Sequence, residues 1–220
     1  MKRPWTKMCG FTQPMDVREA VRAGVDLVGL NFHSGSPRAV SFGLAQRLCS
    51  AMRDEAQRRS SDRPARSVAI FVDPDEELVR DVMEQVAPDV LQFHGDEGPD
   101  FCQSFKHPFL KAFRIQSVAD AARVPEYSGD WSIGYLVDAW SDAAHGGTGR
   151  ALGVDTARAA LSEPKGFLAG GLRPDNVGDL VRELRPFGVD VASGIETRPG
   201  IKSAKLMVAF MQEVETACRG

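Results

Sequence analysis

Two side chains at the ends of apolar runs in this 220-residue sequence are a thiol and a carboxylate. Cys9 stands beside Gly10, where a substrate can reach the thiol, and a thiol pKa of about 8.5 can be lowered by nearby positive charge. Asp138 ends the apolar run 133–137, and a carboxylate carried into an apolar site can become a proton donor. Together they predict a base and acid pair. The alternatives are a buried, unreactive thiol at Cys9 and a helix or loop cap at Asp138.

Arg38 and His94 are candidate substrate-binding residues that follow two other apolar runs. The planar guanidinium of Arg38 can bind a carboxylate or a phosphate, and Pro37 stiffens the loop that presents it. Solvated surface for Arg38 and a structural role for His94 are the alternatives. With no second histidine or carboxylate at ligand spacing, no metal site is predicted. Asp73 is predicted to cap a helix that begins near Pro74.

Glycines follow the last two apolar runs, as Gly170-Gly171 and Ser193-Gly194. Backbone N–H groups can hold a phosphate where no Cβ blocks its approach, so these loops predict a phosphorylated substrate. Tight turns are the alternative. A further cluster, Gly146–Gly149, lacks the lysine of a P-loop and is interpreted as a mobile lid, with a plain flexible loop as the alternative.

Short runs rich in Val, Ile, Leu and Phe alternate with stretches of helical periodicity, which predicts successive strand and helix units around a parallel sheet. The predicted strands are Trp5–Cys9, Val25–Phe32, Ser67–Val72, Asp89–Phe93, Phe109–Arg114, Ser132–Asp138, Gly166–Ala169 and Val189–Ala192. The predicted helices are Pro14–Ala23, Phe42–Gln57, Asp75–Val86, Pro99–Phe105, Pro174–Leu184 and Lys202–Glu215, with weaker ones at Val118–Ala122 and Val154–Leu161. Eight units of roughly 27 residues predict an α/β fold, a single (β/α)8 TIM barrel over residues 1–220, with its active site at the strand carboxyl ends.

The composition is that of an ordinary globular protein, with 43% hydrophobic residues, 26% charged residues and a formal net charge of −3. Nucleic acid is therefore not expected as a main partner. No apolar run approaches the roughly 18 residues that span a bilayer, and residues 1–4 precede no apolar signal core, so we expect no membrane partner and a cytoplasmic protein. The polar stretch Arg53–Arg66 is interpreted as a surface loop. No disulfide framework or zinc site is expected, because no CxxC pair joins the four cysteines, Cys9, Cys49, Cys102 and Cys218.

Taken in order, these residues resemble one family, phosphoribosylanthranilate isomerase, a (β/α)8 enzyme of tryptophan biosynthesis. The resemblance extends from near residue 7 to near residue 210. Its matching stretches are Lys7–Thr12 (KMCGFT), Ser36–Val40 (SPRAV), Leu91–Glu97 (LQFHGDE), Gly146–Gly149 (GGTG), Leu168–Leu172 (LAGGL) with Pro174 and Asn176-Val177, Gly188–Glu196 (GVDVASGIE) and Pro199–Lys202 (PGIK).

The resemblance implies an Amadori rearrangement of N-(5-phosphoribosyl)anthranilate to 1-(2-carboxyphenylamino)-1-deoxyribulose 5-phosphate, with no metal or organic cofactor. It makes Asp138 the general acid for the furanose ring oxygen and Cys9 the general base for the C2 proton. Arg38 would bind the anthranilate carboxylate, and Asp190 would contact the sugar. Gly171, Ser193 and Gly194 would help to hold the phosphate, and the remaining substrate-binding candidates are His94 and Gly170. The expected partner is this small-molecule substrate, bound by a monomer or a homodimer.

Four details depart from the family pattern. Members commonly have Ile at Met8, Leu at Phe93 and Ser at Ala192, and an aromatic residue within the segment aligned with 150–153. The changes at Met8 and Phe93 keep apolar volume and should matter little. The missing aromatic residue is expected to alter how the loop after Gly149 closes.

Other phosphosugar barrels are the nearest alternatives. Indole-glycerol-phosphate synthase would need lysine and glutamate in the barrel mouth, and Lys111 has no evident glutamate partner in the sequence. Ribulose-phosphate epimerase would need histidine and aspartate metal ligands, which the sequence does not assemble. A dual-specificity sugar isomerase would need carboxylates on two strands, where this chain has Cys9. A non-catalytic or differently specific phosphosugar-binding barrel is disfavoured because Cys9, Arg38 and Asp138 are all present, although the fold alone could not decide it.

Overall fold

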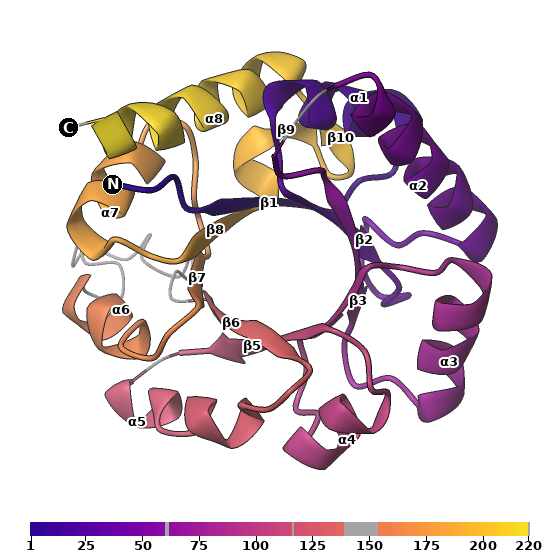
Figure 1. Cartoon of the computed structure of the whole chain (residues 1–220), viewed down its shortest axis with the longest axis horizontal. Coiled ribbons are helices and arrows are strands. Elements are labelled where there is room, and N and C mark those ends of the chain that lie inside the picture. Colours follow the sequence, from indigo (N-terminus) through magenta and orange to yellow (C-terminus); the bar gives the residue numbers. More distant parts are fainter. Residues whose placement is uncertain (60–61, 116, 139–153, 220) are drawn as a thin grey trace.

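Eight parallel strands close into a barrel in the computed structural model, which describes residues 1–59, 62–115, 117–138 and 154–219. The order around the ring follows the chain, and β8 pairs with β1 to close it. The strands are β1 (Trp5–Cys9), β2 (Leu27–Asn31), β3 (Arg66–Phe71), β4 (Val90–Phe93), β5 (Phe109–Arg114), β6 (Ser132–Asp138), β7 (Gly166–Ala169) and β8 (Gly188–Val191). Figure 1 looks into the ring of strands, with the helices outside it. The predicted (β/α)8 barrel is confirmed.

Helices alternate with the strands, and local side chains fix where several of them begin. The Ser41 hydroxyl and the Asp75 carboxylate each accept a hydrogen bond from the backbone N–H three residues further on, which caps α2 and α3. Pro14 opens α1, and Gly24 ends it with a left-handed φ of 92°. The helices are α1 (Pro14–Ala23), α2 (Phe42–Gln57), α3 (Glu76–Gln85), α4 (Pro99–Ser104), α5 (Val118–Ala121), α6 (Val154–Ala160), α7 (Val177–Leu184) and α8 (Ala204–Arg219), with 3-10 turns η1 (Val124–Tyr127) and η3 (Ser193–Ile195).

The predicted cap at Asp73 is wrong. Asp73 has a positive φ of 45°, and its carboxylate accepts a hydrogen bond from the N–H of Asp96, so it links two loops. Helix α7 begins at Val177 rather than at Pro174, because the Asn176 side chain accepts from the N–H of Arg173 and closes a turn first.

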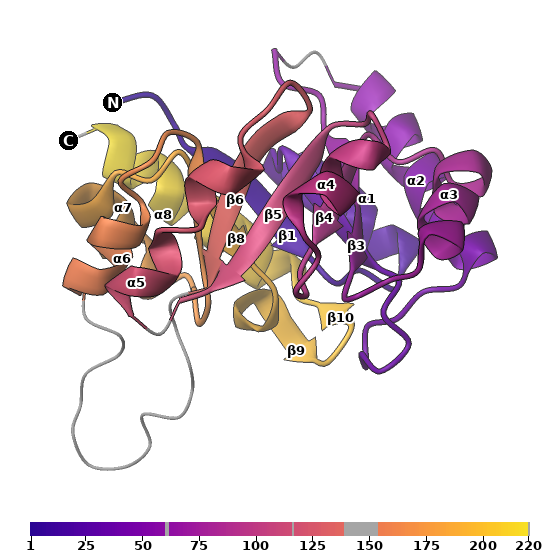
Figure 2. The ribbon, with the colours of Figure 1, turned by 90° about the horizontal axis from the view of Figure 1, so that it is seen from below.

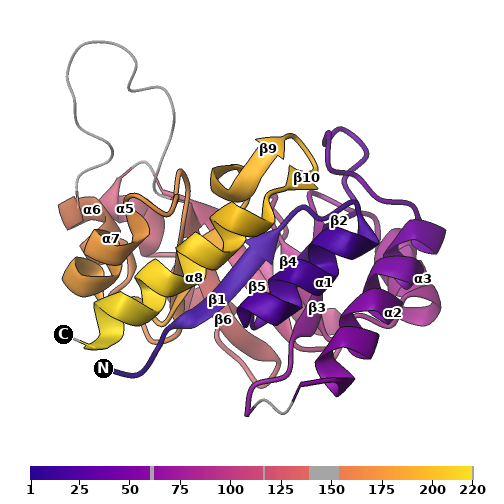
Figure 3. The ribbon, with the colours of Figure 1, turned by 90° about the horizontal axis from the view of Figure 1, so that it is seen from above.

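The C-terminal part of the chain differs from the prediction because Lys202 belongs to a strand. Helix α8 therefore begins at Ala204, and it continues to Arg219 rather than ending at Glu215. Before it, β9 (Glu196–Arg198) and β10 (Ile201–Lys202) form an antiparallel hairpin that the sequence did not predict. Figures 2 and 3 show this hairpin projecting from the end of the barrel opposite the N-terminus, beside the loop after β2. No helix of the described residues is long and apolar enough to cross a membrane.

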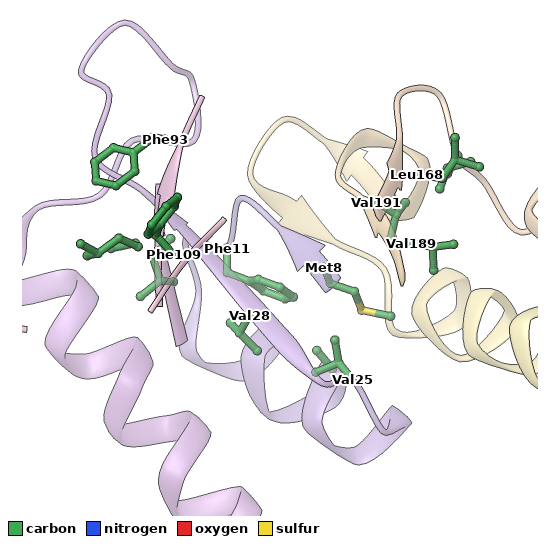
Figure 4. Close-up of a cluster of buried hydrophobic side chains, with 14 of the residues drawn as sticks. Met8, Phe11, Val25, Val28, Phe93, Phe109, Leu168, Val189 and Val191 are labelled. Carbon is green, nitrogen blue, oxygen red and sulfur yellow. The ribbon is translucent and has the colours of Figure 1, made fainter. Parts of the chain in front are cut away.

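Buried apolar side chains form two clusters, one on each face of the barrel wall. The larger lies between the strands and the helices; Figure 4 shows part of it, with Met8 and Phe11 near the helices. The smaller fills the barrel and comprises Leu27, Val68, Ile70, Val90, Leu110, Ala112, Leu136, Phe167 and Ala169. Strand residues two apart share a face, so both sides of these strands are apolar, as expected of a parallel sheet buried on both sides.

Candidate active site

Strand β1 directs Cys9 into the barrel, where it packs against the inner apolar cluster. Lys7 is two residues earlier on the same strand and therefore shares that face. It lies in register with Asp190 of β8, and its Nζ is 2.9 and 3.0 Å from the two carboxylate oxygens. The Lys7 side chain is 0% exposed and that of Asp190 is 9% exposed, so this is a buried ion pair next to the thiol.

The protonation of Cys9 depends on this pair. Burial raises the pKa of Cys9 above its ordinary value, the positive charges of Lys7 and Lys202 oppose the rise, and Asp190 adds to it. Burial acts against the charge of Lys7, but Asp190 and Cys9 favour it and leave the Lys7 pKa above its ordinary value. Lys7 is thus a permanent cation that stabilises the thiolate form of Cys9.

His94 follows β4 at the same end of the barrel and is neutral. Burial, with the charges of Lys7, Arg114 and Lys111, lowers the pKa of His94 to about 4. Its Nδ1 is 2.8 Å from the amide nitrogen of Gln92, so Nδ1 accepts, and the proton of the neutral ring is on Nε2, available as a donor. The Gln92 Oε1 is buried without a hydrogen-bond partner among the described residues.

Asp138 ends β6, partly exposed, between two neighbouring strands. It lies in register with Arg114 at the end of β5 and with Ala169 at the end of β7. Asp138 is two residues after Leu136, which packs inside the barrel, so the carboxylate is on the inner face. Since β7 and β8 separate β6 from β1, Asp138 and Cys9 stand apart around one barrel mouth.

Arg38 lies in the loop after β2 and reaches the hairpin β9–β10. Its Nε and Nη2 donate to the two Glu196 oxygens at 2.9 and 2.6 Å. Glu196 also accepts from Lys202 Nζ at 2.7 Å. The Arg38 side chain passes so close to Gly10 that an added Cβ there would lie 2.3 Å from Arg38 Cδ, which places the arginine beside the residue after Cys9.

The glycines after β7 and β8 bring the two loops into contact. Gly170 and Gly171 have φ values of 87° and 59°, which other residues rarely adopt. A Cβ on Gly194 would lie 1.9 Å from the carbonyl oxygen of Leu172, so only glycine allows this approach. Ser193 begins the short turn η3 at the same place. The geometry leaves backbone close to the mouth without covering side chains, as a phosphate site requires.

Lys111 has a glutamate partner that the sequence did not indicate. Its Nζ is 3.1 Å from a Glu97 oxygen, and each side chain is 3% exposed. The same ammonium lies over the rings of Phe113 and Tyr127, which belong to the outer cluster between strands and helices. The Lys111–Glu97 pair is therefore outside the barrel interior and is not the lysine and glutamate pair of the alternative synthase.

Sequence reasoning assigned no role to four residues of this mouth, which are Lys7, Arg114, Glu196 and Lys202. Alternation along β1 could have placed Lys7 on the Cys9 face, and alternation along β5 could have placed Arg114 at the mouth. Glu196 and Lys202 end two of the stretches that resemble the family, but nothing in those stretches indicated that they pair with each other or with Arg38. The predicted lid Gly146–Gly149 and the altered segment 150–153 lie outside the described residues. Within the described ranges, no group of three or more His, Cys, Asp or Glu side chains is placed to hold a metal ion.

Comparisons with known proteins cover nearly the whole chain. The family model of N-(5'phosphoribosyl)anthranilate (PRA) isomerase matches residues 6–213. The chain is 38% identical over 213 residues to N-(5'-phosphoribosyl)anthranilate isomerase of Pseudomonas fluorescens (strain SBW25), covering 96% of each chain. The solved phosphoribosyl anthranilate isomerase from Thermotoga maritima aligns with a TM-score of 0.81 and 27% identity, over 97% of this chain and 99% of that one. Another solved isomerase, in complex with reduced 1-(o-carboxyphenylamino)-1-deoxyribulose 5-phosphate, aligns at 0.77 and 26% identity with the same coverage. The chain therefore belongs to the N-(5'-phosphoribosyl)anthranilate isomerase family.

Proposed function

We propose that this chain isomerises N-(5-phosphoribosyl)anthranilate to 1-(2-carboxyphenylamino)-1-deoxyribulose 5-phosphate, with Asp138 as general acid and Cys9 as general base. The observation that carries the proposal is the placement of a thiol beside a buried cation on β1 and a carboxylate on β6, at one mouth of the barrel. Two proton transfers at different atoms of one substrate need two such groups held apart.

The reaction balances as an internal proton shift. Asp138 protonates the furanose ring oxygen while the anilino nitrogen lone pair forms the C1=N bond, which opens the ring to a Schiff base. The Cys9 thiolate then removes the C2 proton. The electron pair of the C2–H bond forms the C1=C2 bond while the C1=N π pair returns to the anilino nitrogen, which gives an enolamine. Transfer of a proton to C1 and loss of the proton from the C2 hydroxyl give the ketone. Side chains supply every step, so we expect no cofactor.

The surrounding charges support these roles. Lys7 stabilises the thiolate of Cys9, which must be deprotonated before it can act as a base. Neutral His94 can offer its Nε2–H to a substrate oxygen near β4. Asp190 is held by Lys7, so its predicted contact with the sugar would have to use an oxygen lone pair that the ammonium leaves available.

Recognition of the two anionic ends divides between the loops after β7 and β8 and the loop after β2. We assign the phosphate to the backbone of Gly170, Gly171, Ser193 and Gly194. We assign the anthranilate carboxylate to Arg38, beside Gly10 and Cys9. Because β1 stands between β8 and β2 in the ring, a substrate held at both ends would lie across the end of β1, where Cys9 is.

The proposal is tested by generating phosphoribosylanthranilate in situ and following its fluorescence loss above the rate of spontaneous hydrolysis. We expect activity from the unaltered chain and a fall of about 10²- to 10⁴-fold in kcat for Cys9→Ser and for Asp138→Asn. Cys49→Ser, at a buried thiol between α2 and the barrel, is the matched control for folding and should keep kcat. An inactive unaltered chain would reject the isomerase assignment and favour another phosphosugar ligand.

The cellular setting is part of the same proposal. The substrate is a small metabolite, so we expect a cytoplasmic enzyme that needs neither nucleic acid nor a membrane. Monomer or homodimer stays a prediction, which the mass measured by light scattering at assay concentration decides.

A further inference from the structure

We infer that Glu196 is the positioning residue that sets the carboxylate specificity of the site, by holding Arg38 so that one edge of its guanidinium faces the substrate. The inference rests on the proposed role of Arg38. An arginine has two edges that can each bind a carboxylate with paired hydrogen bonds, one formed by Nε and Nη2 and the other by Nη1 and Nη2.

Glu196 occupies only the first of these edges. Its two oxygens take the Nε–H and one Nη2–H of Arg38, at 2.9 and 2.6 Å. Nη1 makes no hydrogen bond to any described residue, and the side chain keeps 22% of its surface exposed. The second edge is thus available for a carboxylate from solution while the first fixes the plane of the guanidinium.

Glu196 has a buried side chain, which is held in place by a cation and a backbone N–H. Its side chain is 4% exposed, and its Oε1 accepts hydrogen bonds from Lys202 Nζ and from the N–H of Gly200. Burial raises the pKa of Glu196, but Arg38 and Lys202 outweigh it and bring the pKa below its ordinary value, so the group is ionised at neutral pH. A mobile side chain in this place could not orient an arginine as well.

Lys202 links this support to the base. Its ammonium donates to the carbonyl oxygens of Cys9 and Ala192 and to Glu196, which uses all three of its protons. Lys202 is 0% exposed and therefore does not bind the substrate itself. The two cations and one carboxylate leave a net charge of about +1, which suits a single substrate carboxylate.

The carboxylate of Glu196 is therefore part of specificity rather than a competitor for Arg38. Its removal should lower affinity for a carboxylate-bearing aryl group and leave affinity for the phosphosugar part unchanged. A merely structural role would weaken both to the same extent.

The experiment measures the Kd of two probes by titration calorimetry. One is reduced 1-(o-carboxyphenylamino)-1-deoxyribulose 5-phosphate, and the other is the same molecule without the carboxylate. We expect the unaltered chain to prefer the first, Arg38→Ala to lose the preference, and Glu196→Gln to reduce it by about 10- to 100-fold. The Kd of the second probe should stay at the unaltered value in both variants.

Further variants make the test decisive. Glu183→Gln removes an exposed glutamate that pairs with Arg158 and should leave both Kd values unchanged. Glu196→Asp keeps the charge but shortens the side chain, so it should lose part of the preference for the carboxylate. This variant keeps the inference testable if Glu196→Gln does not fold. In the Arg38→Ala background, Glu196→Gln should cause no further loss.

Three outcomes overturn the inference. An undiminished preference in Glu196→Gln, or an enhanced one, would mean that Glu196 does not orient Arg38 or competes with the ligand. An equal loss for both probes would make its role structural. No preference in the unaltered chain would also remove the proposed role of Arg38. The chemistry proposed for Cys9 and Asp138 is tested separately, by the loss of isomerase activity in Cys9→Ser and Asp138→Asn.

Discussion

The inside of the barrel holds two regions with opposite chemistry. The apolar interior is the cluster Leu27, Val68, Ile70, Val90, Leu110, Ala112, Leu136, Phe167 and Ala169. The polar mouth is the group Lys7, Cys9, Gln92, His94 and Asp190. The first has no polar side chain to satisfy. The second holds a buried ion pair, a half-buried neutral histidine and a buried amide oxygen that has no hydrogen-bond partner within the described part of the chain.

Stability and function depend on different regions of this fold. Burying apolar side chains stabilises the barrel, whereas a buried ion pair such as Lys7–Asp190 gains little net stability, because desolvation offsets attraction. The buried ion pair therefore needs a functional reason, and the stabilisation of the Cys9 thiolate by Lys7 supplies one. Changes in the two regions should separate stability from catalysis.

Removing the cation from the polar mouth should have the largest effect. In Lys7→Met the Asp190 carboxylate is left buried without its partner, so the free energy of unfolding should fall by about 3–5 kcal/mol. The kcat/KM should also fall, because the Cys9 thiolate loses a stabilising charge. Urea denaturation and the fluorescence assay measure both, with Lys205→Met on exposed α8 surface as control. Unchanged stability and rate would remove the functional distinction between the regions.

Opening the apolar interior should affect stability alone. Phe167 is 2% exposed, and Phe167→Ala should lower the free energy of unfolding by about 3–5 kcal/mol through lost burial and a cavity. At temperatures where the variant remains folded, kcat should be that of the unaltered chain. Phe187→Ala removes a ring that is 41% exposed and should destabilise much less. A kcat that fell with stability would mean that the apolar interior positions the catalytic groups.

The acid limb of the activity profile should report the Cys9 thiol. The thiolate is the active form of Cys9 and becomes more abundant as pH rises, so kcat/KM should increase by about tenfold per pH unit below the pKa of the thiol. Burial raises that pKa and therefore places the limb at higher pH than for an exposed thiol. In Lys7→Met the same limb should lie at higher pH. A profile that is flat in the unaltered chain, or the same in both proteins, would contradict the assigned base.

A smaller dependence in the same direction should appear in stability. Because the pKa of His94 is about 4 in the folded chain against an ordinary 6.5, the unfolded chain binds an extra proton between these values. Stability should therefore decrease as pH falls through this window. His94→Gln should reduce the slope of unfolding free energy against pH there, measured by urea titrations at several pH values. An equal slope in the variant would show that other groups cause the acid sensitivity.

Local patterns were enough to predict the barrel and most of its mouth. Apolar runs and helical spacing gave the eight strands in order, and their carboxyl ends located Cys9, His94 and Asp138 at one end. Asp73 was misplaced because Asp75, two residues later, competes for the same cap and wins.

The charge pairs of the mouth could not be predicted, because each depends on closure of the ring. Lys7 and Asp190 are 183 residues apart, and Arg38 and Glu196 are 158 residues apart, so no local pattern joins them. The hairpin β9–β10 was also missed, since its two strands are only three and two residues long. The roles of the site residues in catalysis stay predictions.

Control of the Cys9 thiol by the polar mouth is measured by the pH dependence of Cys9 alkylation with iodoacetamide. Mass spectrometry follows the reaction in the unaltered chain and in Lys7→Met/Asp190→Leu. Removing both charges should recover most of the stability lost in Lys7→Met. Because Lys7 acts on the thiol more strongly than Asp190 does, the apparent pKa of Cys9 should nevertheless be higher in the double variant. An apparent pKa equal to that of the unaltered chain would contradict the claim that the polar mouth controls the base.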